Sequence, residues 1–284
     1  MLKYRLLFGT LMTIFFAGVV IFDGWLDGSL TSSAPVKPQG TIFCILISLL
    51  VVAAQFEFAK LADAKKVKIF LPVSIIASVF LATSWYWPQF IKIPLGMYIV
   101  FVLAFTLLAL FLYQYLFYGT EAVIANCGVN YFSIIYLGLL GGFCVALRIE
   151  FGVWALMMFV FVVKCSDIGA YTFGKLFGKH KFSPKISPGK TWEGMAGAVF
   201  LAIIVSVIFA LSRGIMAWWL AVIFGFCFAF IGQLGDLAES LIKRDAQQKD
   251  SADSVPGFGG ILDVIDSPLG AAFFAYLFFL CCSK

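Results

Sequence analysis

The sequence predicts an all-α fold, a polytopic transmembrane helical bundle of about nine spans with a cytoplasmic N-terminus. Of its 284 residues, 62% are hydrophobic and only 12% are charged, and the mean hydropathy is +1.02. Such a chain cannot keep a solvated exterior around an apolar core, so lipid must surround it. Its apolar stretches repeatedly reach the roughly 20 residues that a helix needs to cross a bilayer. These observations exclude a large soluble domain.

The expected spans follow one another with short polar joints between them. In chain order they cover residues 6–22, 41–59, 69–87, 95–118, 131–147, 151–171, 191–211, 215–241 and 267–282. The fifth contains Gly138, Gly141 and Gly142, which either allow close helix packing or mark an irregular segment. We expect residues 1–130, with about four spans, to form an N-terminal membrane region and residues 131–284 to form a catalytic region.

The distribution of positive charge predicts the orientation of these spans. With nine spans and the N-terminus inside, fifteen of the 20 Lys and Arg residues fall on the cytoplasmic side and five outside, as the positive-inside rule requires. The two most polar joints, residues 172–190 and 242–266, then both lie in the cytoplasm. The first span could instead be a signal peptide, whose removal would leave the orientation of the rest unchanged. We therefore look for chemistry in the two polar joints.

The first polar joint and its flanks contain a carboxylate that is a candidate functional residue and a candidate phosphate-binding site. Asp167 lies near a helix end, where a charge at membrane depth is usually kept for function or pairing, although it could merely face the interface. Pro188 ends the loop, so Gly189, Lys190 and Thr191 are expected at the amino end of the next helix, where free N–H groups favour an anion. Alternatively, this basic joint only contacts anionic lipid headgroups.

The second polar joint follows a helix whose last turns are strongly charged. If this helix continues through Arg244, then Asp236, Glu239, Ser240 and Lys243 have i, i+3, i+4, i+7 spacing and share one face. Carboxylates and a cation would then converge. Ion pairs that only tie helix ends together are the alternative.

The start of the last helix can add a second carboxylate pair. Asp263 and Asp266 are three residues apart there, and three preceding glycines, Gly257, Gly259 and Gly260, let the backbone approach a ligand closely. Hard oxygen ligands suit Mg²⁺, and basic side chains suit phosphate. With one histidine and no C-x-x-C pair, any metal should be bound by oxygen.

Motifs in these joints resemble the signature of the CDP-diacylglycerol synthase (phosphatidate cytidylyltransferase) family. They read Ser240-x-x-Lys243-Arg244-x-x-x-x-Lys249-Asp250, Pro256-Gly257-x-Gly259-Gly260-x-x-Asp263-x-x-Asp266 and, upstream, Ser187-Pro-Gly-Lys190-Thr191-Trp-Glu193-Gly194. The resemblance is strong from about Phe161 to Pro268. It implies a multi-span, dimeric enzyme of phospholipid biosynthesis that joins CTP to phosphatidic acid, releasing pyrophosphate and forming CDP-diacylglycerol with a divalent metal.

The resemblance and the spacing together assign roles to individual residues. The expected catalytic residues are Asp236, Lys243, Arg244, Lys249, Asp250 and Asp263. The expected substrate-binding residues are Lys190, Ser187, Thr191, Ser240, Gly257, Gly259, Gly260 and Asp167. The expected metal ligands are Asp236, Glu239, Asp263 and Asp266, holding Mg²⁺ with room for a second, monovalent or divalent, cation. The expected partners are CTP, phosphatidic acid, membrane lipid and a second copy of the chain, but not nucleic acid; the expected setting is the inner (plasma) membrane, with the site facing the cytoplasm.

Two positions depart from the family pattern. The signature usually has histidine where Phe258 stands and arginine where Val264 stands, so a proton donor and a phosphate-neutralising group are both missing. The carboxylates and the cations remain, and a phosphate nucleophile that is already ionised needs no general base. We therefore expect an active member of the family.

Three other functions are alternatives to this prediction. The chain could be a catalytically silent relative, a CTP-dependent lipid kinase of the polyprenol type, or an anion transporter. Transport is disfavoured because the charges gather at the cytoplasmic ends of the spans and not at mid-span. A kinase would release CDP instead of pyrophosphate.

Overall fold

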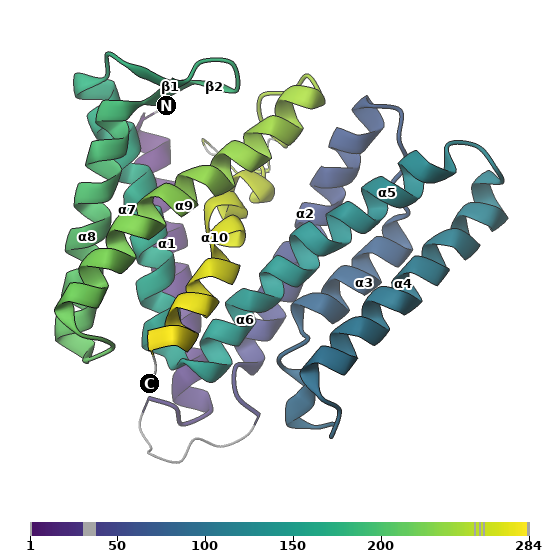
Figure 1. Ribbon diagram of the computed structural model, residues 1–284, viewed down its shortest axis with the longest axis horizontal. Coiled ribbons are helices and arrows are strands. Elements are labelled where there is room, and N and C mark those ends of the chain that lie inside the picture. Colours follow the sequence, from purple (N-terminus) through teal and green to yellow (C-terminus); the bar gives the residue numbers. More distant parts are fainter. Residues whose placement is uncertain (1, 31–37, 253, 256, 258, 283–284) are drawn as a thin grey trace. The chain divides into compact units, whose positions relative to one another are not determined.

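The computed structural model describes residues 2–30, 38–252, 254–255, 257 and 259–282 of the chain (Figure 1). In order, its elements are α1 (Leu2–Leu26), α2 (Thr41–Ala64), α3 (Leu71–Ala82), η1 (Trp87–Gln89), α4 (Leu95–Tyr118), α5 (Val123–Ser133), η2 (Ile134–Leu139), α6 (Leu140–Glu150), α7 (Gly152–Phe177), β1 (Lys181–Ser183), β2 (Ser187–Thr191), α8 (Trp192–Arg213), α9 (Trp218–Asp245) and α10 (Ile261–Cys282). The predicted all-helical class is confirmed, with one small antiparallel hairpin, β1–β2, inserted between α7 and α8.

Eight helical stretches of the described chain are long and apolar enough to cross a membrane, so the protein is an integral membrane protein. They correspond to eight of the nine expected spans, with α5, η2 and α6 joined as one stretch, Val123–Glu150. The third expected span is different. Residues 69–87 fold as α3, which has only 12 residues, followed by turns and η1. At 1.5 Å per residue, α3 is too short to cross alone. The orientation of the spans stays a prediction.

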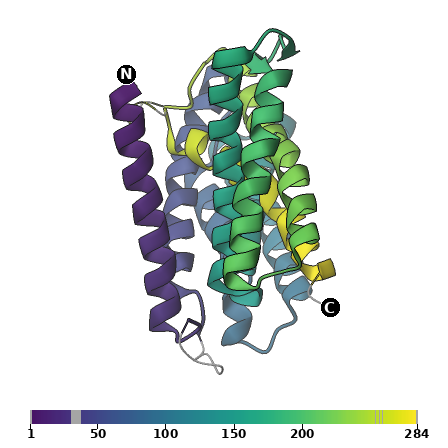
Figure 2. The same ribbon diagram turned by 90° about the vertical axis from the view of Figure 1, so that its left-hand side faces the viewer.

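The chain divides into two compact units by its contacts. Unit 1 contains Met1–Glu150 and Ala246–Val264, and unit 2 contains Phe151–Asp245 and Ile265–Lys284. In unit 1, α1 runs alongside α2 (Figure 2). Helix α10 begins in unit 1 and continues in unit 2. The expected functional division at residue 130 is a separate matter and stays a prediction.

A fully buried arginine holds the ends of α1, α2 and α6 together in unit 1. The Nε atom of Arg148 lies 2.8 Å from Oδ2 of Asp23, and its NH2 atom lies 2.6 Å from Oδ2 of Asp27. Oδ1 of Asp23 accepts hydrogen bonds from the N–H groups of Ile42 and Phe43 in the first turn of α2, where an anion is favoured. Oδ2 of Asp27 accepts a hydrogen bond from the N–H of Gly40, the N-cap residue of α2, at 3.1 Å. The arginine therefore compensates two carboxylates that bind the amino end of α2.

Replacing Arg148 should be strongly destabilising. We expect Arg148→Leu to lower the free energy of unfolding by about 3–5 kcal/mol, because it strands two buried carboxylates. The control is Lys68→Met, which breaks an exposed ion pair with Asp63 and should change stability by less than about 1 kcal/mol. Thermal unfolding in detergent measures both; equal shifts for the two variants would contradict the expected role of Arg148.

The glycines of the fifth expected span serve both of the roles considered for them. Residues Ile134–Leu139 form a π-helical segment between α5 and α6, so the segment is irregular. A Cβ atom added at Gly138 would lie 2.8 Å from the backbone of Ser78, and one added at Gly142 would lie 2.8 Å from the carbonyl oxygen of Leu81. These glycines therefore also let α3 pack closely against this stretch.

Unit 2 is held together by close helix crossings that glycines permit. Helices α7, α8 and α9 pack side by side (Figure 1). Helices α9 and α10 meet at Gly235 and Gly270: a Cβ atom added at Gly270 would lie 2.7 Å from Cα of Gly235. Small residues at such a crossing let two backbones approach. Because Asp236 and Asp266 flank this contact in sequence, the crossing brings the carboxylates of α9 and α10 close to each other.

A methyl group at this crossing should separate the two helices. We expect Gly270→Ala to lower the free energy of unfolding by about 1–3 kcal/mol through overpacking. The matched control is Gly128→Ala in α5, where an added Cβ atom would meet no described atom within 4 Å and alanine should stabilise the helix by up to about 1 kcal/mol. Opposite signs in thermal unfolding are expected; a neutral Gly270→Ala would show that the crossing tolerates a side chain.

Candidate active site

Three carboxylates converge in unit 2, as the sequence spacing predicted for α9 and the start of α10. One oxygen from each of Asp236, Glu239 and Asp266 lies within 4.8 Å of the other two. Helix α9 does continue past Arg244, to Asp245, which places Asp236 and Glu239 on one face. Glu239 and Asp266 are buried, and Asp236 is half-buried. Three hard oxygen donors at this spacing fit a divalent cation.

Lysines from three elements surround these carboxylates. Lys190 Nζ of β2 lies 3.0 Å from Oδ2 of Asp236, and Lys243 of α9 pairs with Glu239 one turn earlier. Lys164 Nζ of α7 lies 3.9 Å from Oδ1 of Asp266. Each carboxylate of the triad therefore has a cation nearby, which offsets the repulsion between like charges.

Asp167 adds a fourth carboxylate to the same group. Its Oδ1 accepts hydrogen bonds from Nε2 of Gln233 at 3.0 Å and from Oγ of Ser267 at 3.4 Å. Its Oδ2 lies 3.4 Å from Nζ of Lys164. Asp167 thus belongs to the cluster through α7, α9 and α10, and does not merely face the interface.

The hairpin corrects the expected setting of Lys190. The sequence placed Gly189, Lys190 and Thr191 at the amino end of a helix. Ser187–Thr191 is strand β2 and α8 begins at Trp192, so Gly189 and Lys190 precede the helix and only Thr191 lies at its amino end. Thr191 is the N-cap of α8, and its side chain accepts a hydrogen bond from the N–H of Gly194 at 3.1 Å. From the strand, Lys190 Nζ also donates to the carbonyl oxygen of Gln233 at 2.9 Å. The lysine therefore points toward α9.

The remaining predicted residues of unit 2 lie on the same elements. Ser240 Oγ donates to Oδ1 of Asp236 at 3.3 Å. Arg244 Nε donates to the carbonyl oxygen of Ile186 at 3.2 Å, which ties the end of α9 to the hairpin. Ser187 begins β2 and pairs with Ser183 of β1. The hairpin and the last turns of α9 are thus in direct contact.

A second group of predicted residues lies in unit 1, around the beginning of α10. Asp263 Oδ2 accepts hydrogen bonds from the N–H of Ser251 at 2.9 Å, from the hydroxyl of Ser251 at 2.7 Å and from the N–H of Gly260 at 2.7 Å. This oxygen therefore holds the loop against the first turn of α10. The role of Asp263 as a metal ligand stays a prediction.

The glycines before α10 form a tight turn. Val255 and Gly259 exchange two backbone hydrogen bonds of 2.7 and 3.1 Å. Gly257 and Gly259 have φ angles of +84° and +102°, which side chains disfavour. A Cβ atom added at Gly260 would overlap Oγ of Ser251 and Oε2 of Glu57. The glycines are thus required by the turn and by close approach.

The polar joints are shorter than the sequence suggested. Helix α7 continues to Phe177, and the loop between α9 and α10 covers only residues 246–260. That loop contains Lys249 and Asp250, both exposed. Of the two departures from the family pattern, Val264 is half-buried in the first turn of α10, whereas Phe258 lies outside the described residues, as does Pro256 of the motif.

Several residues of these two groups were missed from the sequence. Lys164 and Gln233 precede Asp167 and Asp236 by three residues, a helical spacing that could have revealed them. Glu57 of α2 contacts the second group and is described below. A carboxylate within an otherwise apolar span is the signal that could have found it.

The chain is also similar in sequence to known proteins. Residues 3–282 match the Cytidylyltransferase family, so the chain belongs to that family. Over 134 residues it is 41% identical to the phosphatidate cytidylyltransferase of Haemophilus influenzae, covering 44% of this chain and 46% of that protein. Over 136 residues it is 42% identical to that of Staphylococcus saprophyticus (48% and 52%), and over 124 residues 40% identical to that of Mycobacterium bovis (44% and 40%). The chain thus spans about half of the length of the curated relatives it matches.

The carboxylate triad should bind a divalent cation by itself. We expect Glu239→Gln to weaken Mn²⁺ binding at least about tenfold, because it removes a charged ligand. The matched control is Asp245→Asn, which changes an exposed carboxylate at the end of the same helix and should leave the affinity unchanged. Calorimetry on detergent-purified protein measures both; equal affinities for wild type and Glu239→Gln would exclude this ligand.

Proposed function

We propose that this protein is a phosphatidate cytidylyltransferase, which converts CTP and phosphatidic acid into CDP-diacylglycerol and pyrophosphate. The observation that supports it most directly is the cluster of four carboxylates and three lysines in a chain that belongs to the Cytidylyltransferase family. Two anionic substrates must approach each other in this reaction. The site therefore needs carboxylates to hold a metal ion and basic side chains to neutralise the phosphates. The related proteins that carry this name supply the substrate pair for the proposal.

The proposed chemistry is a single in-line displacement. A phosphate oxygen of phosphatidic acid attacks the α-phosphorus of CTP, a new O–P bond forms, and the bond to the β-phosphate oxygen breaks to release pyrophosphate. The nucleophile is already ionised at neutral pH, so no side chain has to remove a proton. Mg²⁺ held by Asp236, Glu239 and Asp266 would neutralise charge on the phosphates.

The basic residues would bind the substrate anions in this proposal. Lys190 and Lys243 pair with carboxylates in the structure and would turn to phosphate oxygens when substrate enters. Arg244 lies on the same helix as Lys243, and Lys249 lies on the loop that follows. These side chains would accelerate the reaction by holding the two phosphate groups close together and by stabilising the charge that develops on them.

The setting of the reaction is part of the same proposal. The excess of positive charge in alternate joints supports a cytoplasmic site and a cytoplasmic N-terminus. Both lie on one side only if residues 69–87 cross the membrane, with the turns and η1 after α3 completing the crossing that α3 is too short to make alone. Phosphatidic acid would reach the site from the inner (plasma) membrane, with its acyl chains between spans. A homodimer, implied by the family resemblance, would be checked by measuring mass in detergent.

A purified-protein assay tests the proposal. Detergent-solubilised protein with CTP, Mg²⁺ and phosphatidic acid should form CDP-diacylglycerol and pyrophosphate in equal amounts. We expect Asp236→Asn to lower kcat at least about 100-fold, because it removes a charge from the triad, and EDTA to abolish turnover. Asp245→Asn should retain activity.

Other outcomes of this assay would point to the alternatives. Release of CDP with a phosphorylated lipid would identify a lipid kinase. CTP binding without any product would identify a silent relative, and it would contradict the proposed activity.

A further inference from the structure

Glu57 is a buried carboxylate within an apolar span of unit 1, outside every motif described above. It lies on α2, and only 3% of its surface is exposed. A carboxylate at such a position is costly unless hydrogen bonds compensate it, and it is usually kept for a purpose. Its partners therefore indicate what it does.

Both oxygens of Glu57 accept hydrogen bonds from the segment that precedes and begins α10. Oε1 accepts from the hydroxyl of Ser254 and the N–H of Ile261, each at 2.9 Å. Oε2 accepts from the hydroxyl of Ser251 at 3.0 Å and the N–H of Leu262 at 2.8 Å. Each oxygen thus meets one hydroxyl and one backbone N–H group.

These contacts join distant parts of the sequence. Glu57 caps the first turn of α10, where N–H groups lack helical partners and an anion is favoured. Ser251 also donates to Asp263, so the two carboxylates share one hydroxyl. Glu57 thus holds Ser251 and Ser254 of the loop before α10. The same loop carries Lys249 and Asp250, and the helix turn carries Asp263.

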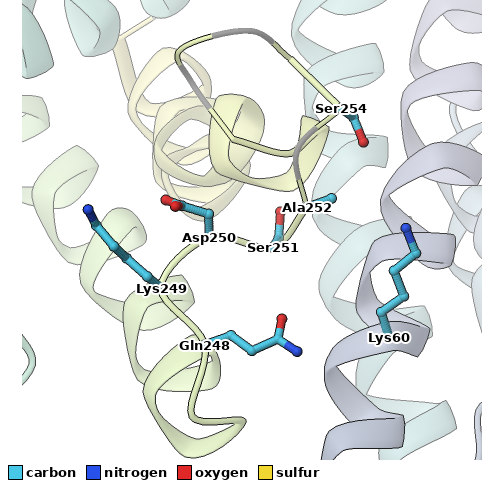
Figure 3. Close-up of a pocket in the computed structure, with 7 residues that line it drawn as sticks. All are labelled: Lys60, Gln248, Lys249, Asp250, Ser251, Ala252 and Ser254. Atoms are coloured by element: carbon cyan, nitrogen blue, oxygen red, sulfur yellow. The ribbon is translucent and has the colours of Figure 1, made fainter. Parts of the chain in front are cut away.

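The held loop borders an open cavity of about 680 Å³ in unit 1. Lys60, one turn after Glu57 on α2, forms one side of it, and Gln248, Asp250 and Ser254 lie on the loop side (Figure 3). Gln248 extends toward α2, whereas Lys249 extends away from it. Helix α2 therefore anchors the loop through Glu57 and contributes a cation beside it.

We propose that Glu57 is a positioning residue of this enzyme: its carboxylate fixes the 246–260 loop and the first turn of α10, so that Lys249, Asp250 and Asp263 are held in their working geometry. The inference rests on the proposed function. In this inference the N-terminal membrane region contributes to catalysis by positioning other residues, and Glu57 itself does not need to contact substrate.

The variant Glu57→Gln tests this role with little change in volume. In the wild type, one carboxylate oxygen accepts from the N–H of Ile261 and the other from the N–H of Leu262. Glutamine replaces one of these oxygens by an NH₂ group, which cannot accept, so one of the two hydrogen bonds is lost in either orientation of the amide. We expect kcat per folded molecule to fall about 10- to 100-fold at a temperature well below unfolding, since small displacements of reacting groups have effects of this size. Ser254→Ala, which removes only one hydroxyl, should lose less activity than Glu57→Gln.

Hydrogen–deuterium exchange supplies a readout that does not depend on activity. In Glu57→Gln, amide exchange should rise about tenfold or more in peptides covering 248–262 and stay unchanged in peptides from α3 to α6. The matched control is Asp63→Asn, which alters an exposed carboxylate on the same helix and should change neither exchange nor kcat.

The outcomes separate the inference from the function on which it rests. Unchanged exchange in 248–262, or a local rise with full kcat, would overturn the positioning role. A rise throughout unit 1 with full kcat in the folded fraction would show that Glu57 serves stability alone. If wild-type protein makes no CDP-diacylglycerol, the proposed function fails, while the exchange data still decide whether Glu57 holds the loop.

Discussion

The mutual repulsion of Asp167, Asp236, Glu239 and Asp266 is the constraint on which unit 2 depends. Carboxylates this close to one another in a partly buried setting are unstable unless cations or hydrogen-bond donors compensate them. Lys164, Lys190 and Lys243 supply the cations, and Gln233 and Ser267 supply donors. Because these partners come from α7, β2, α9 and α10, the compensation also fixes how four elements meet. In the proposed function, the lysines would exchange these carboxylates for substrate phosphates, and the carboxylates would exchange the lysines for a metal ion.

Close helix packing makes this arrangement possible. The carboxylates of α9 and α10 come together because glycines face each other at Gly235 and Gly270, so the two backbones approach without intervening side chains. The β1–β2 hairpin then directs Lys190 toward α9, where it contacts Asp236 and the carbonyl oxygen of Gln233. Packing and electrostatics therefore act together: the crossing brings like charges into proximity, and the lysines make that proximity tolerable.

Unit 1 shows the same principle in two places. Arg148 compensates Asp23 and Asp27, which themselves cap α2, and Glu57 caps α10 while holding the loop before it. In both cases a buried charge satisfies backbone N–H groups at a helix terminus, where the helix itself offers no partner. One helix of the expected N-terminal membrane region thus contacts a segment that contains the family motif.

The sequence alone determined the membrane class, most of the helices and the charged face of α9. These features depend on local patterns: apolar runs of spanning length, and the i, i+3, i+4 spacing that puts Asp236, Glu239 and Ser240 on one side. Only the tertiary structure decided that Lys190 reaches α9 from a strand, that Asp263 holds Ser251 and Gly260, and that α3 has only 12 residues. It also brought Glu57 to a loop about 190 residues later in the chain. Contacts between distant segments depend on how helices cross and where a buried carboxylate finds donors, and no local spacing encodes that.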